Sequence, residues 1–158
     1  MESQQKQAWL TSLRLLEATP KTRKELAKKL LDKGLPEPIV EETLDKLEAQ
    51  GFLSDLAYAK NLTARLTQEK PSGRRKISFE LKRHGVPAAI QEELLSGITS
   101  AEESERAMSI ASLKWPQFER FGTEKRKKRI YDFLIRRGFD FQIVRDVMNK
   151  LGTEFGEE

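Results

Sequence analysis

The sequence contains no cysteine and a single histidine, His84. Without cysteine there are no disulfides and no thiolate nucleophile, and this suits a reducing cytoplasm, where we expect the protein to be located. One histidine near the end of a helical pattern is a poor basis for a metal site or a nucleophile–histidine pair. We expect His84 to be structural, favoured by the helix dipole, and we expect no enzymatic activity, no metal and no cofactor.

Long apolar runs and phosphate-binding loops are also missing. Uncharged stretches are far shorter than the roughly 20 apolar residues of a membrane-spanning helix, and Met1–Gln5 is polar, so we expect neither a membrane span nor a signal peptide. No glycine loop of the GxxxxGK[ST] or GxGxxG type occurs. Adjacent carboxylates such as Glu41 and Glu42 point in different directions on a helix, which suits a shared acid–base site poorly.

The composition still allows a packed core. The 158 residues are 37% hydrophobic and 34% charged, with 9 glycines and 6 prolines, which is typical of an ordered, soluble chain. The formal net charge of +4 is too small by itself to identify nucleic acid as the partner. The distribution of the charge is more informative than its total.

One short pattern occurs three times along the chain. Its copies are Leu30–Leu35, Leu81–Val86 and Leu134–Phe139, and their glycines, Gly34, Gly85 and Gly138, stand 51 and then 53 positions apart. A glycine just past a helix end can take the left-handed conformation, while the next residue packs an apolar side chain onto the leucine of the last turn. Each copy therefore predicts a helix closed by a Schellman cap. Just beyond the caps, Pro36, Pro87 and Asp140 can begin the next helix.

A further helix precedes each of these helix pairs. Its apolar positions are Trp9, Leu13 and Leu16 in the first copy, Leu56, Ala59, Leu62 and Leu66 in the second, and Ala107, Ile110, Ala111 and Leu113 in the third. The spacings Thr22-x-x-Glu25 and Ser100-x-x-Glu103 predict capping boxes, and Ser54 or Asp55 can cap the helix that follows it.

These patterns predict an all-α protein of three tandem three-helix, helix-turn-helix-like repeats in an elongated, curved array. We place the repeats at residues 1–53, 54–99 and 100–151, with a flexible tail at residues 152–158. A repeat of about 50 residues is too small to be robust alone, so we expect neighbouring repeats to pack together. We expect a monomer.

The second helix of every repeat is basic, whereas the third helix of the first repeat is acidic. Five consecutive cations, Lys125–Arg129, cannot all point into a core. Basic faces at intervals could follow a phosphate backbone or an acidic polymeric partner, with affinity that falls as salt rises; the alternative is a solvated helix face. The residues that we expect to contact a partner are Arg74, Arg75, Lys76, Lys82, Arg83, Lys125, Arg126, Lys127, Lys128, Arg129, Arg136 and Arg137.

The aromatic side chains are candidates for stacking on nucleic-acid bases. Those considered are Trp9, Phe52, Tyr58, Phe79, Phe118, Tyr131, Phe133, Phe139 and Phe141. Most stand at helical or cap positions beside aliphatic residues, so we expect at least about three-quarters of them in the core. For Trp115, just before Pro116, the question stays open.

Four motifs follow one another along nearly the whole chain. They are Arg23-Lys24-Glu25-Leu26 with Leu30-x-x-Lys33-Gly34; Leu47-x-x-x-Gly51-Phe52-Leu53-x-Asp55-x-x-Tyr58-Ala59; Gly73-x-x-x-Ile77-x-x-Glu80-Leu81-x-x-x-Gly85-Val86; and Phe133-Leu134-x-Arg136-Arg137-Gly138-Phe139. In this order and at this spacing they resemble the RecX family of regulators of the recombinase RecA. The chain departs from the family pattern at two positions. Ser54 stands where members often have an acidic residue, and Thr22 stands where serine is common. Both residues keep the capping chemistry.

The resemblance implies a non-enzymatic regulator that binds along the helical groove of the RecA–DNA filament. Such a regulator blocks filament growth or promotes its loss, and so inhibits strand exchange, RecA ATPase and RecA-stimulated repressor cleavage, in DNA repair, homologous recombination and the SOS response. Three units could bridge successive RecA protomers and gain affinity by multivalency. Their basic faces could meet acidic groups of the filament, or single-stranded or duplex DNA with weak specificity.

Other functions stay open at this point. The second and third helices of each repeat resemble a helix-turn-helix, so a DNA-binding transcriptional regulator is the main alternative, although phosphates would repel the acidic third helix of the first repeat. A generic helical-repeat scaffold would bind its partner with little salt dependence and would not affect RecA. A small enzyme comes last, and an activity lost on replacing His84 would indicate it.

Overall fold

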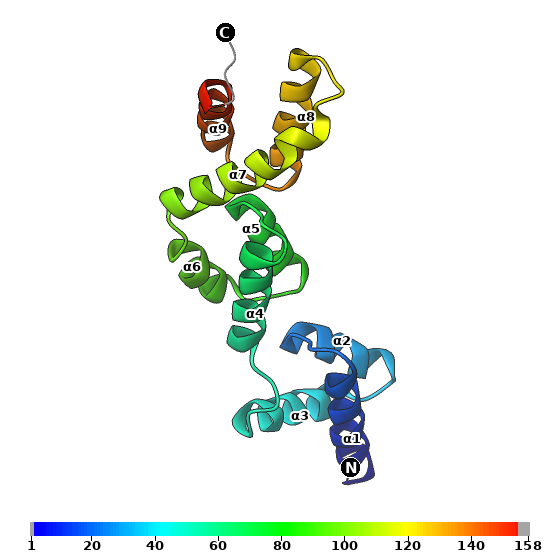
Figure 1. The fold of residues 1–158 in the computed structure, drawn as a ribbon. Coiled ribbons are helices and arrows are strands. Elements are labelled where there is room, and N and C mark those ends of the chain that lie inside the picture. The colour runs from blue at the N-terminus through cyan, green and yellow to red at the C-terminus, as the bar shows by residue number, and fades with distance from the viewer. Residues whose placement is uncertain (1, 155–158) are drawn as a thin grey trace. The chain divides into compact units, whose positions relative to one another are not determined.

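The computed structural model describes residues 2–154. Within this range the chain forms nine α-helices and one 3-10 helix and no strand, which confirms the all-α prediction (Figure 1). The elements are α1 (Glu2–Ala18), α2 (Arg23–Asp32), α3 (Glu37–Ala49), α4 (Asp55–Gln68), α5 (Arg74–Arg83), α6 (Ala88–Ser96), α7 (Ser100–Lys114), η1 (Trp115–Phe118), α8 (Thr123–Arg136) and α9 (Phe141–Glu154).

The three predicted Schellman caps close α2, α5 and α8. Gly34, Gly85 and Gly138 have φ angles of 88°, 82° and 83°. In each cap the amide after the glycine donates to the carbonyl of the leucine five residues earlier, at 3.3, 3.0 and 3.2 Å. These leucines are fully buried, so each cap also anchors its helix in a core. A fourth cap of the same form, at Gly51, ends α3.

The chain forms two compact units, which are described separately. Unit 1 consists of the residues up to Asn61 together with Leu81–Gln91, and unit 2 of Leu62–Glu80 together with the residues from Glu92 onward. The second helical repeat therefore contributes residues to both units.

In unit 1, α3 packs against both α1 and α2. The core consists of Ala8, Leu26, Leu30, Leu35, Ile39, Val40, Leu44, Leu47 and Leu53. On α1, Ala8 and Ser12 are fully buried, whereas the predicted Trp9, Leu13 and Leu16 are only partly buried beside them. The predicted apolar positions therefore do pack against this core, and the small side chains of Ala8 and Ser12, which the sequence pattern did not single out, let α1 lie close to its neighbours.

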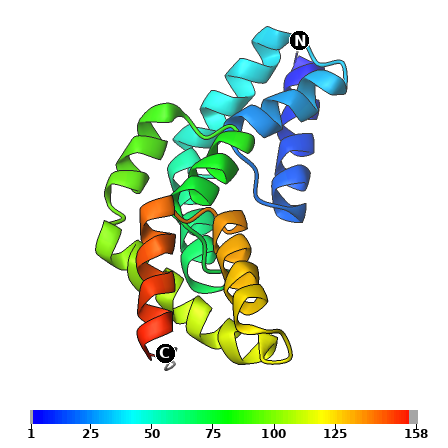
Figure 2. The same cartoon turned by 90° about the horizontal axis from the view of Figure 1, so that it is seen from above.

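In unit 2, α7 packs against α8 and α9, and α8 and α9 lie side by side (Figure 2). The core consists of Ala107, Ile110, Ala111, Trp115, Ile130, Leu134, Phe139, Ile143, Val144, Val147 and Leu151. The sequence predicts Leu113 on this apolar face, but in the structure its side chain is 69% exposed and does not belong to the face. It lies two residues from the buried Ala111, which on a helix turns it away from the core.

The helix starts follow the predicted capping chemistry with one correction. Thr22 and Glu25 form the predicted capping box of α2. At α4, the Ser54 hydroxyl accepts from the amide of the third residue after it, at 3.1 Å. The cap of α7 is Thr99 rather than Ser100, because a hydroxyl one residue earlier performs the same task, accepting from the Glu102 amide at 3.1 Å.

The C-terminal helix extends further than the sequence predicts. Residues 152–154, which we assigned to a flexible tail, belong to α9. Leu151 is fully buried and holds the last turn of this helix against the core of unit 2. Residues 155–158 of the expected tail lie outside the described residues. In the part of the chain that the structure describes, no helix is both long and apolar enough to cross a membrane.

Candidate functional site

The basic helix α5 begins in unit 2 against the end of the basic helix α8. The Gly73 amide donates to the Arg137 carbonyl at 2.8 Å, and the Arg75 amide donates to the Gly138 carbonyl at 3.2 Å. The first free N–H groups of one helix thus meet the free carbonyls at the end of the other, where the two helix dipoles attract each other. This junction fixes the positions of the basic side chains at both helix ends.

In unit 1, the start of the basic helix α2 meets the end of α5 in a similar way, but through side chains. The Thr22 hydroxyl donates to the His84 carbonyl at 2.6 Å, and Nδ1 of His84 lies 3.0 Å from Oε2 of Glu25. Burial alone would raise the pKa of Glu25, but hydrogen bonds from His84 and from the Thr22 amide outweigh it and lower that pKa. The single histidine thus joins two helices, as a structural histidine would.

A carboxylate from the following repeat accepts a hydrogen bond from a backbone amide at the start of α2. A second carboxylate does the same at the start of α5. Asp55, the first residue of α4, accepts from the Arg23 amide at 2.8 Å, and Glu103 of α7 accepts from the Arg74 amide at 3.1 Å. Negative charge is favourable at a helix N-terminus. The sequence patterns do not predict this role. No local spacing reveals it, because the Arg23 and Arg74 amides stand 32 and 29 residues before the acids that accept from them.

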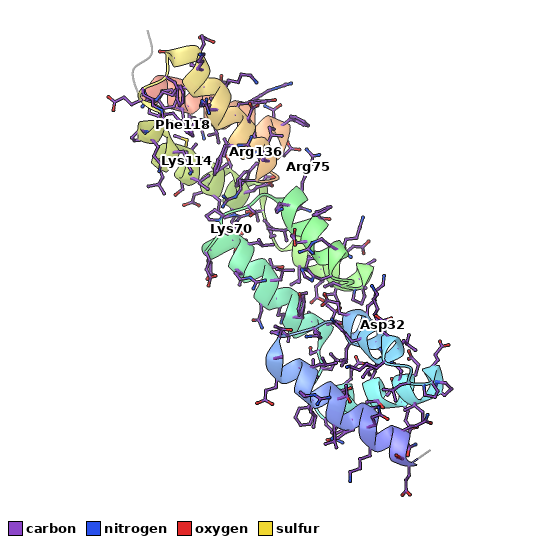
Figure 3. All side chains as sticks on the ribbon, turned by 90° about the vertical axis from the view of Figure 1, so that its right-hand side faces the viewer. Asp32, Lys70, Arg75, Lys114, Phe118 and Arg136 are labelled. Atoms are coloured by element: carbon purple, nitrogen blue, oxygen red, sulfur yellow. The ribbon has the colours of Figure 1, made fainter. Side chains whose placement is uncertain are left out.

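The structure divides the twelve predicted contact residues into two groups. The exposed group consists of Arg75, Lys82, Arg83, Lys125, Lys128, Arg129 and Arg136. The partly buried group consists of Arg74, Lys76, Arg126, Lys127 and Arg137. Figure 3 labels two of the exposed cations of unit 2, Arg75 from α5 and Arg136 from α8, which come from the two helices that meet at the α5–α8 junction.

Three partly buried arginines are engaged in holding the fold. Nε of Arg126 donates to the Trp115 carbonyl at 2.9 Å, and its guanidinium carbon lies 4.0 Å from the centre of the Trp115 ring. Nε of Arg137 donates to the Pro71 carbonyl at 3.1 Å, and burial lowers its pKa. Arg74 donates to a carbonyl in the α6–α7 connection at 3.0 Å. These guanidinium groups are less available to a partner than their positions in the sequence suggest.

Some of the exposed cations also have neighbours within the chain. Nζ of Lys128 lies 3.2 Å from the Asp132 carboxylate, one turn along α8. The guanidinium carbon of Arg129 lies 3.9 Å from the centre of the Phe121 ring. Exposed ion pairs of this kind contribute little to stability and exchange readily with water, so Lys128 can still meet a partner's anion.

The acidic face of α3 is partly neutralised by one arginine at the start of α2. Arg23 forms ion pairs with Glu41, Asp45 and Glu48, those with the first two at 2.7 and 2.9 Å. Burial alone would lower the pKa of Arg23, but the three carboxylates raise it above its ordinary value. This helix therefore repels phosphates less than its sequence suggests, and Arg23 is occupied within the fold.

The prediction that at least about three-quarters of the aromatic side chains lie in the core was wrong, because one of the nine is fully buried and four others, Trp9, Phe118, Tyr131 and Phe133, are only partly buried against a core. Of the nine aromatic residues that we considered, Phe139 is fully buried, whereas Phe52, Phe79 and Phe141 are 53%, 60% and 49% exposed. Trp115, left open by the sequence, is buried. Position next to aliphatic residues in the sequence does not distinguish a ring in the core from one at the edge of a helix.

Comparison with known proteins accounts for all three repeats. Three family models match the chain in order: the first three-helix domain of RecX at residues 8–47, the second at residues 54–95 and the third at residues 101–148. The regulatory protein RecX of Chlorobium limicola (strain DSM 245 / NBRC 103803 / 6330) is 37% identical over 142 residues, which are 89% of this chain and 86% of that protein. The regulatory protein RecX of Streptomyces coelicolor (strain ATCC BAA-471 / A3(2) / M145) is 30% identical over 152 residues, which are 96% and 81% of the two chains.

Solved structures show the same fold. The crystal structure of RecX from Lactobacillus salivarius superposes with a TM-score of 0.84 at 20% identity, over 97% of this chain and 99% of that one. A second crystal structure, of a regulatory protein RecX, gives 0.80 at 23% identity, over 92% and 73% of the two chains. With three family domains matched in order along nearly all of its length, this chain belongs to the RecX family of regulatory proteins.

Proposed function

We propose that this protein binds the RecA–DNA nucleoprotein filament and inhibits the recombinase, ATPase and coprotease activities of RecA, thereby modulating DNA repair and the SOS response. The observation that carries the proposal is the match of all three RecX domains along one chain. We further propose that it acts in the cytoplasm as a monomer, by binding and without catalysis.

The exposed cations of α5 and α8 support this proposal. A RecA–DNA filament is a repeating polyanion, and cations repeated along a helical array can meet its phosphates or acidic side chains. The residues proposed to make these contacts are the exposed group, Arg75, Lys82, Arg83, Lys125, Lys128, Arg129 and Arg136. Several weak contacts on one chain add up through multivalency.

The experiment measures RecA ATPase on single-stranded DNA while this protein is titrated below the RecA concentration. The test variant replaces Lys125, Lys128 and Arg136 by glutamate and spares Arg126, whose side chain packs on Trp115. A matched control replaces Arg65, Lys70 and Lys150, exposed cations outside the basic helices, by glutamate. The control has the same change in net charge.

We expect the wild type to reduce ATPase progressively, the control to act like the wild type, and the test variant to need at least about tenfold more protein. No effect of the wild type at one molecule per RecA protomer would refute the proposed function. Equal loss in both variants would assign the effect to net charge rather than to these side chains. Nanomolar, sequence-specific binding to duplex DNA without RecA would favour the helix-turn-helix regulator instead.

A further inference from the structure

Two phenylalanines of unit 2 lie on its surface beside the basic residues. Phe79 of α5 is 60% exposed, and Phe141, the first residue of α9, is 49% exposed. Neither ring belongs to the hydrophobic core of the described part of this unit. Single exposed apolar residues are common on protein surfaces, so exposure alone does not indicate a binding surface, and the residues around the two rings have to be considered.

Each ring lies close to a cation from the start of α5. The guanidinium carbon of Arg75 is 5.5 Å from the centre of the Phe141 ring, and Nζ of Lys76 is 5.9 Å from the centre of the Phe79 ring. Arg75 and Phe79 are four residues apart on one helix and therefore share a face. Each ring thus has a cation of α5 beside it, Lys76 at Phe79 and Arg75 at Phe141.

The neighbouring carboxylates Glu80, Asp140 and Asp146 are engaged within the protein, the last of them accepting from Nε2 of Gln142 at 3.1 Å. Oε1 of Glu80 lies 3.5 Å from Nζ of Lys76, and Oδ1 of Asp140 accepts from the Gln142 amide at 2.9 Å as it caps α9. Arg136, at the end of α8, is exposed and adds a further cation where α5 and α8 meet. The surface formed by Phe79, Phe141, Arg75 and Arg136 is therefore both aromatic and cationic.

We propose that this surface binds single-stranded DNA, with Phe79 and Phe141 stacking on two unpaired bases and Arg75 and Arg136 contacting the phosphates between and beside them. Unpaired bases expose flat faces on which aromatic side chains stack, whereas duplex bases are stacked on one another. A single strand alternates bases and phosphates, as this surface alternates rings and cations. The binding needs no RecA, and only the choice of DNA over RNA rests on the proposed function.

The test uses fluorescence anisotropy with the full chain and no RecA. One labelled strand is an oligothymidylate of about 30 nucleotides, and the other is an abasic strand of equal length, which keeps the phosphates and lacks the bases. The test variant is Phe79→Leu with Phe141→Leu, and a second variant replaces both by Trp. The control is Leu113→Ala, an apolar residue on α7 of the same unit that is more exposed than either ring.

We expect the wild type to bind oligothymidylate at least about tenfold more tightly than the abasic strand, since the abasic strand lacks the bases on which the two rings stack. The double leucine variant should lose this preference while its weak binding to the abasic strand stays unchanged. The tryptophan variant and the Leu113→Ala control should keep the preference. Circular dichroism verifies that all variants are folded.

Equal wild-type affinity for the two strands would show binding by charge alone and would overturn the inference. The inference would also fail if the leucine variant bound oligothymidylate normally yet lost inhibition of RecA, because the rings would then contact the protein. A wild type that prefers bases over abasic DNA but leaves RecA ATPase unchanged refutes the proposed function and supports the stacking surface. The two proposals therefore fail separately.

Discussion

The backbone of Gly73 lies directly against the backbone of Gly138. A Cβ atom on Gly73 would come 2.3 Å from the Gly138 carbonyl oxygen, and one on Gly138 would come 2.3 Å from the Lys76 amide nitrogen. Gly34 has the same left-handed conformation as Gly138, but apart from Gly34 itself and its two chain neighbours no residue of the described chain has an atom within 4 Å of the position that its Cβ would take. Alanine substitutions at the three glycines can therefore distinguish two contributions to the loss of stability, the clash of a Cβ atom with a nearby backbone and the strain of a left-handed conformation.

Alanine at these glycines should destabilise the protein to different degrees. Gly34→Ala meets only left-handed strain and should lower the free energy of unfolding by about 1–2 kcal/mol. Gly73→Ala meets only the clash, and should cost about 1–3 kcal/mol. Gly138→Ala meets both and should cost the most. Urea unfolding followed by circular dichroism measures all three, and equal losses at Gly34 and Gly138 would contradict the close approach at the α5–α8 junction.

The buried carboxylate of Glu103 should stabilise the start of α5. It is 2% exposed and accepts from the Arg74 amide, so Glu103→Ala leaves that N–H without its partner and should cost about 2–3 kcal/mol. Glu103→Gln keeps an acceptor oxygen and should cost less. Glu102→Ala, at the exposed neighbouring position, is the control and should change the unfolding free energy by less than about 0.5 kcal/mol. A Glu103→Ala variant as stable as this control would refute the capping role.

Local sequence patterns predicted the features that depend on local physics. The caps at Gly34, Gly85 and Gly138 were predictable, because a Schellman cap needs only a glycine, a leucine four residues before it and an apolar residue after it. The capping box of Thr22 and Glu25 depends likewise on a short spacing. The all-α class and the three repeats follow from these helix ends.

Contacts between distant residues were not predictable in this way. Asp55 caps a helix that begins 32 residues earlier, and the spacing within its own helix does not reveal it. Arg126 stands in a run of five cations that looks uniform in sequence, yet its side chain packs on Trp115. Phe79 and Phe141 occupy apolar helical positions but lie beside cations instead of in the core. In each case the contact is with a residue of another element, or it depends on which face of its helix the side chain occupies.

The Glu25–His84 pair should make stability depend on pH. The pKa of Glu25 is below its ordinary value of 4.5, so its ionised form favours the folded state. This contribution is fully present above about pH 5 and is lost as the pH falls through the lowered pKa. At pH 7, Glu25→Gln should lose about 0.5–1 kcal/mol, a modest amount because the pair is partly exposed.

Urea unfolding of wild type and Glu25→Gln at pH 7, 5, 4 and 3 measures this effect. The difference between them should shrink towards zero at the lowest pH. The control Glu93→Gln, an exposed carboxylate on α6, should show no such trend. A difference that stays constant down to pH 3 would rule out the ionised pair as its origin.

The two neighbouring cations Lys125 and Arg126 should behave differently when truncated. Arg126→Ala removes the stacking on Trp115 and the hydrogen bond to its carbonyl, so it should lower the unfolding free energy by about 1–2 kcal/mol. It should also shift the emission of Trp115 to longer wavelength as water reaches the ring, measured in a Trp9→Phe background that leaves one of the two tryptophans. Lys125→Ala should leave stability and emission unchanged, since Lys125 is exposed. If the two variants were equally stable, Arg126 would belong with Lys125 among the cations open to a partner; a loss confined to Arg126 instead assigns that cation to the fold of unit 2.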